Sequence, residues 1–77
     1  MGIDLAALRR QKGLSLAEIA KETKIGVSYL RAIEQGQFAK LPGGIYSISY
    51  IRQYARAIEC DESHILDSYY AFAVVAG

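Results

Sequence analysis

Apolar residues recur three and four positions apart along most of this chain, and no stretch alternates with the period of two that is typical of a strand. The clearest helix start is the run LSLAEI, where Ser15 can cap a helix and Glu18, three residues later, can close a capping box. Upstream, Asp4 can cap a helix over residues 5–12. The pattern therefore predicts two short helices, the second running to about Glu22.

The segment TKIG interrupts this pattern, and the helical spacing resumes in VSYLRAIEQG. Leu30 and Ile33 are expected to face the interior, and Gly36 to end the helix in a left-handed conformation. A helix, a tight turn and a second helix over about residues 15–36 form the helix-turn-helix layout.

Pro42 and Gly43 predict a type II turn, because proline fixes φ and glycine accepts a positive φ. A longer helix is expected after it, over about residues 46–58, with one apolar and one mixed face. The predicted inward stripe consists of Ile48, Ile51, Ala55 and Ile58, with Tyr54 at its edge, and the opposite face consists of Tyr46, Tyr50, Gln53 and Ala57.

Asp61 can cap a last helix over about residues 61–75, whose apolar residues again have helical spacing. Tyr70, Val74 and Val75 extend beyond what one face needs, and we interpret them as a frayed end rather than a dimer contact. The expected fold is all-α: five short helices in a single helix-turn-helix domain over residues 1–77.

Composition agrees with a packed globule, since 52% of the 77 residues are hydrophobic and the charged 22% are mixed in sign. Cys60 is the single cysteine, so an internal disulfide is impossible and a reducing compartment, the cytoplasm, is expected. The longest apolar stretch, AFAVVA, is far shorter than the roughly 20 residues of a membrane span.

Catalytic chemistry has little support in this sequence. His64 is the single histidine, and together with Cys60 it falls short of the four protein ligands of a structural zinc site. The segment PGGIYS lacks the glycine spacing and the GK[ST] ending of a phosphate loop. We therefore expect neither an enzyme nor a bound metal or cofactor.

DNA binding is the alternative function to consider for a helix-turn-helix. The exposed early positions of its second helix are expected to be Val27, Ser28 and Ala32, and none is a residue that makes bidentate base contacts. The net charge is only +1. The residues that remain for DNA contact are Ser15, Lys24, Ser28, Arg31, Gln35 and Lys40, of which Ser15, Lys24, Arg31 and Lys40 are phosphate candidates. DNA binding by a transcriptional regulator is therefore the second choice.

The run from Ala20 to Gly36 resembles the helix-turn-helix of repressor-like, Xre-like domains, except that Lys24 stands where these usually have glycine. Over nearly the whole chain, LRRQKGLSLAEIAKETKI, YLRAIEQGQFAKLPGG and YIRQYAR are similar to the cytoplasmic helix-turn-helix domain of the RodZ family. That resemblance implies an adaptor that docks on MreB, the bacterial actin homologue. In the RodZ family such a domain is joined to a transmembrane helix, so two alternatives stay open: a domain of a longer chain tethered to the inner membrane, or a small stand-alone relative.

The RodZ family docks through aromatic residues of its fourth helix, and the matching positions here are Tyr46 and Tyr50. Gln53 shares their predicted face, and Arg52 with Arg56 forms a basic pair at its rim. The competing interpretation is that these residues are ordinary boundary and solubilising side chains of the helix. We expect the outer face of this helix to be a partner-binding surface.

Overall fold

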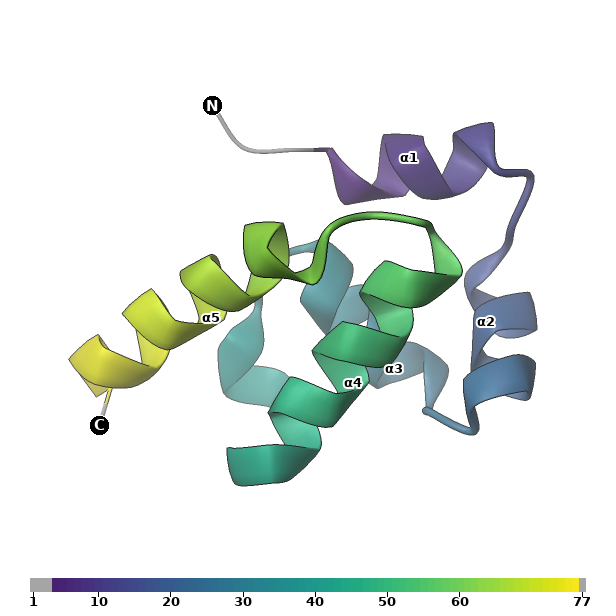
Figure 1. Cartoon of the computed structure of the whole chain (residues 1–77). Coiled ribbons are helices and arrows are strands. Elements are labelled where there is room, and N and C mark those ends of the chain that lie inside the picture. The colour runs from purple at the N-terminus through teal and green to yellow at the C-terminus, as the bar shows by residue number, and fades with distance from the viewer. Residues whose placement is uncertain (1–3, 77) are drawn as a thin grey trace.

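The computed structural model describes residues 4–76, and every regular element in that range is helical (Figure 1). The elements are α1 (Leu5–Gln11), α2 (Leu16–Thr23), α3 (Val27–Glu34), the 3₁₀ turn η1 (Phe38–Lys40), α4 (Gly44–Ala57) and α5 (Glu62–Ala76). The all-α, five-helix prediction is confirmed.

The helix starts follow the capping residues read from the sequence. The Asp4 carboxylate accepts a hydrogen bond from the Ala7 N–H at 3.0 Å, and the Ser15 hydroxyl accepts one from the Glu18 N–H at 3.0 Å. The Glu18 carboxylate in turn accepts from the Ser15 N–H at 2.9 Å, which completes the capping box. Each cap satisfies amide groups that a helix end leaves without partners.

α4 is the central helix, and it packs against α2, α3 and α5 (Figure 1). Its buried face consists of Ser47, Ile51, Tyr54 and Ala55. Ile19 of α2 and Leu30 of α3 are fully buried in the same core, and burial of each such side chain stabilises the fold by about 1.5–3 kcal/mol. Ile48, expected on the inward stripe, is only half-buried because the buried face is centred away from it.

The entry into α4 differs from the type II turn that was predicted. Gly43 has the expected positive φ of 98°, but its ψ is 165°, whereas a type II turn has ψ near 0°. Gly44 follows with φ 58°, so the two glycines together turn the chain and α4 begins two residues earlier than predicted. The buried Ser47 hydroxyl accepts a hydrogen bond from the Gly43 N–H at 2.8 Å.

Lys24, which stands where repressor-like turns usually have glycine, adopts the glycine conformation. Its φ of 66° and ψ of 20° lie in the left-handed region, and its N–H donates to the Ala20 carbonyl at 2.8 Å. The turn therefore keeps the geometry of a glycine turn while a side chain bears the strain.

Candidate functional site

The first turn of α4 presents two large apolar side chains to solvent. Ile45 is 78% exposed and Tyr46 is 63% exposed. Exposed apolar residues that stand together are more informative than isolated ones, because they are typical of contact surfaces. Tyr46 therefore lies on the solvent side of the helix, where the sequence placed it, whereas Ile45 was not among the residues expected there.

Tyr50, one turn after Tyr46, is half-buried rather than fully exposed. Its ring packs on Tyr29 of α3, with the ring centroids 5.5 Å apart and the ring planes at 42°. This aromatic contact restricts the freedom of the Tyr50 ring. Tyr29, Tyr46 and Tyr50 together form what we call the tyrosine surface, at the junction of α3 and α4.

The sequence pattern predicted the two α4 members of the tyrosine surface but missed Tyr29. Helical spacing describes each helix by itself, and the side of α3 that meets α4 depends on how the two helices cross. Tyr50 consequently lies on the flank of α4 that faces α3. The side directly opposite the core is occupied by Ile45, Ser49 and Arg56.

Gln53 and the two arginines differ from one another in their contacts. The Gln53 side chain is half-buried, and its amide donates to the Ser49 hydroxyl at 3.1 Å within the helix. Arg52 forms an ion pair with Glu62 of α5 at 2.7 Å, whereas Arg56 is exposed and has no ion pair within residues 4–76. An exposed pair such as Arg52–Glu62 contributes about 0–1 kcal/mol, and it neutralises the arginine.

Beneath the buried face of α4 lies a polar network that the sequence did not reveal. The Arg9 guanidinium donates two hydrogen bonds to the Glu34 carboxylate, at 2.7 and 3.2 Å, and a third to the Leu14 carbonyl at 2.9 Å. The Tyr54 hydroxyl donates to the same carboxylate at 2.6 Å. These bonds join α1, α3 and α4, and so fix the position of the helix that carries the tyrosine surface.

The network also shifts the ionisation of its members. Burial opposes the charge on Glu34, but the hydrogen bonds from Arg9 and Tyr54 outweigh it and hold the pKa of this carboxyl below its ordinary 4.5. Burial, together with the hydrogen bond to Glu34, raises the pKa of Tyr54. Both groups therefore keep one protonation state at neutral pH, which suits a structural role.

Comparison with known proteins assigns the family. Residues 4–65 match the family model described as a helix-turn-helix domain. The chain is also 39% identical over 69 residues to the cytoskeleton protein RodZ of Streptococcus pneumoniae, an alignment that covers 90% of this chain and 25% of that protein. This chain is a RodZ-type helix-turn-helix domain.

A second relative is the uncharacterized membrane protein YmfM of Bacillus subtilis, 34% identical over 56 residues, which cover 73% of this chain and 19% of that protein. The RodZ-type domain thus spans a quarter or less of the length of these relatives. No solved structure matches it significantly. Within the described part of the chain, no helix is long and apolar enough to cross a membrane.

α3, the helix that would contact DNA bases in the DNA-binding alternative, has fewer exposed side chains than expected. Ala32 was predicted on the exposed face of α3, but it is 1% exposed and packs in the core; that placement was wrong. Val27 is half-buried. The other candidates, Lys24, Ser28, Arg31, Gln35 and Lys40, are exposed.

The proposed phosphate position at the start of α2 is already used within the RodZ-type domain. The Ser15 hydroxyl and N–H both bond to Glu18, and the Glu18 carboxylate places a negative charge where a phosphate would bind. Like charges repel, so this end of α2 is poorly suited to the DNA backbone.

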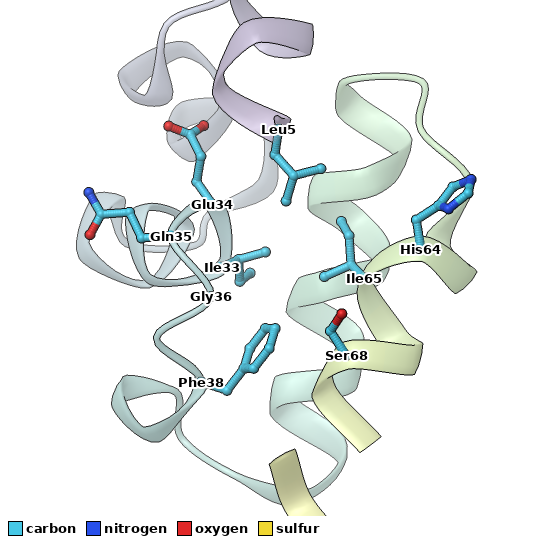
Figure 2. Close-up of a pocket in the computed structure, with 9 residues that line it drawn as sticks. All are labelled: Leu5, Ile33, Glu34, Gln35, Gly36, Phe38, His64, Ile65 and Ser68. Carbon is cyan, nitrogen blue, oxygen red and sulfur yellow. The ribbon is translucent and has the colours of Figure 1, made fainter. Parts of the chain in front are cut away.

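A separate hollow of about 270 Å³ lies between α1, α3 and α5 (Figure 2). The side chains of Ile33, Phe38 and Ile65 converge on it, whereas Gln35 and His64 point away. It is smaller than the roughly 300–1,000 Å³ typical of small-molecule sites, and the Glu34 carboxylate at its edge is bonded to Arg9 and Tyr54. No group of three or more metal-ligating side chains occurs in the part of the chain described.

Proposed function

We propose that this RodZ-type domain is a protein-docking module that binds an MreB-type actin homologue through the tyrosine surface. The observation that carries the proposal is the exposure of Tyr46, 63%, one helical turn before Tyr50, whose ring packs on Tyr29. The relationship to a cytoskeleton protein supports the choice of an actin-like partner.

The physical argument is that tyrosine buries a large amphipathic area with little loss of side-chain freedom. Aromatic residues are enriched among the few side chains that dominate binding energy. Because Tyr50 is already packed on Tyr29, less of its conformational freedom remains to be lost on docking. The charge of Arg56 is expected to speed encounter with an acidic partner more than to strengthen the complex.

The decisive experiment measures the affinity of the domain for the purified MreB-type protein of the same organism. Tyr46→Ala should weaken binding at least about tenfold, because truncation of a central aromatic contact costs more than about 1 kcal/mol. Tyr46→Ala combined with Tyr50→Ala should abolish it. Val75→Ala is the matched control, since this side chain is 88% exposed near the end of α5 and its loss should leave the affinity unchanged.

Unfolding curves of the same variants separate docking from folding. Tyr46→Ala should leave the free energy of unfolding within about 0.5 kcal/mol of wild type, because an exposed ring contributes little to the fold. Unchanged affinity in the double variant would defeat the proposal. Specific binding to a DNA duplex at physiological salt, lost in Arg31→Ala, would favour the DNA-binding alternative instead.

We also propose that this domain faces the cytoplasm, within a longer parent chain that is anchored in the inner membrane. One relative is named as a membrane protein, and the domain covers only a fraction of both relatives. A reporter enzyme that is active only in the cytoplasm, fused to the N-terminus of the parent protein, should be active. An inactive reporter would contradict this placement.

A further inference from the structure

A groove of about 470 Å³ runs along α4 on the side away from the tyrosine surface and reaches α5. Ile45 and Ile48 of α4 and Tyr70 of α5 supply its apolar lining. Arg52 and Arg56 also line it, and none of its lining residues is acidic. Ser49 and Gln53 complete the lining, so the groove combines an apolar part with a polar part whose charged side chains are both basic.

The two parts are separated along the helix. Ile45 and Arg56 stand eleven positions apart on α4, which corresponds to about 16 Å at the helical rise of 1.5 Å per residue. Ile45 is 78% exposed and Tyr70 is 46% exposed. About three turns of a partner helix match this length.

The charge in the groove belongs mainly to one residue. Arg52 is neutralised by an ion pair at 2.7 Å with Glu62, the first residue of α5. Arg56 has no ion pair within residues 4–76, so its guanidinium remains as the positive charge of the groove. A carboxylate is the group that complements a guanidinium best, because it accepts two parallel hydrogen bonds.

We propose that this groove binds an amphipathic helix of the same MreB-type partner, with an apolar side chain on Ile45 and Tyr70 and an Asp or Glu beside Arg56. This inference rests on the proposed function, and it adds a second contact to the tyrosine surface. A helix that lays an apolar face into a groove between two helices is a recurrent mode of recognition. Tyr70 of α5 lines one side of the groove, which distinguishes this contact from one made by α4 alone.

The test measures the affinity of the domain for the purified MreB-type protein with three groove variants. Ile45→Ala and Tyr70→Ala should each weaken binding about three- to tenfold, and Arg56→Glu should weaken it about tenfold or more. Val75→Ala controls for the loss of an exposed apolar side chain. Lys21→Glu controls for the charge reversal, because Lys21, like Arg56, lies in the last turn of its helix.

The outcomes separate the groove from the tyrosine surface. Weaker binding by the groove variants, with unchanged controls and unfolding curves, supports the proposal. If Ile45→Ala, Tyr70→Ala and Arg56→Glu all stay within twofold of wild type while Tyr46→Ala still weakens binding, the groove proposal is overturned and the proposed function stands. If the wild-type domain does not bind the MreB-type protein, both are overturned.

Discussion

Two tyrosines on α4 show how one helix serves two purposes. Tyr54 is fully buried, and its hydroxyl donates to the Glu34 carboxylate at 2.6 Å. Tyr46, eight residues earlier, is 63% exposed. The same side chain thus anchors the helix at one position and is exposed at the other, where we propose that it contacts a partner. The two rings differ because the neighbouring helices surround Tyr54 but leave Tyr46 open to solvent. We therefore expect changes in two regions, the network around Tyr54 and the tyrosine surface, to have separable effects on folding and docking.

The largest expected effect comes from removing the acid at the centre of the buried network. Glu34→Ala leaves the half-buried Arg9 charge without its carboxylate and the Tyr54 hydroxyl without its acceptor, and we expect a loss of about 3 kcal/mol in the free energy of unfolding. Urea denaturation followed by circular dichroism measures it. Glu22→Ala, at an exposed glutamate of α2, is the control and should change stability by less than about 0.5 kcal/mol. Equal losses of unfolding free energy in Glu34→Ala and Glu22→Ala would show that the network around Glu34 does not stabilise the fold.

The pH dependence of stability sharpens the same point. The pKa of Glu34 is lowered in the folded state, so ionised Glu34 contributes stability above the unfolded pKa, and this contribution is lost as pH falls through the folded pKa. Glu34→Gln should therefore cost about 2 kcal/mol at pH 7. The difference in the free energy of unfolding between variant and wild type should narrow as pH falls below 4.5. A gap that stays constant from pH 7 to pH 3 would contradict this assignment, and denaturation at a series of pH values measures it.

Matched removal of one hydroxyl compares the two tyrosines directly. Tyr54→Phe loses a hydrogen bond to a charged acceptor and should destabilise the domain by about 1.5 kcal/mol. Tyr46→Phe, at the exposed ring, should leave stability unchanged. Thermal unfolding of the two variants tests the comparison. A larger drop in melting temperature for Tyr46→Phe than for Tyr54→Phe would reverse our assignment of the two roles.

The smallest effect is expected outside both regions, at the strained turn between α2 and α3. Lys24→Gly removes the Cβ that strains a residue in the left-handed conformation. Because the strain energy removed exceeds the entropic cost of glycine, the free energy of unfolding should rise by about 0.5 kcal/mol. Lys24→Ala keeps the Cβ and the strain, which makes it the control for loss of the charge. A gain in the alanine variant as large as in the glycine variant would show that charge, and not backbone strain, limits this turn.

Much of the fold could be predicted because its signals are local. Asp4, Ser15 and Glu18 cap helices within three residues of their own position, and the spacing of Ile51, Ala55 and Ile58 identified buried positions of α4 and its C-cap. Ala32 was misplaced because a small residue is compatible with either face of a helix, and only the packing of α3 against its neighbours buries it.

The candidate surfaces were less predictable. Tyr46 and Tyr50 were found from their place on α4, but Tyr29 joins them from another helix. The groove likewise needs Tyr70 from α5, and Arg52 and Arg56 are distinguished only by Glu62, ten residues after Arg52. No helical period relates such residues, since they belong to different helices.

The sequence by itself determined that this chain forms five short helices, with the starts of α1 and α2 set by side-chain caps, because caps and helical spacing act over three or four residues. The tertiary structure alone decided that Arg9, Glu34 and Tyr54 share one network and that Tyr50 packs on Tyr29 of α3. Those outcomes depend on the crossing of helices whose contacting residues stand 20 to 25 positions apart, a distance over which the order of residues carries no periodic signal.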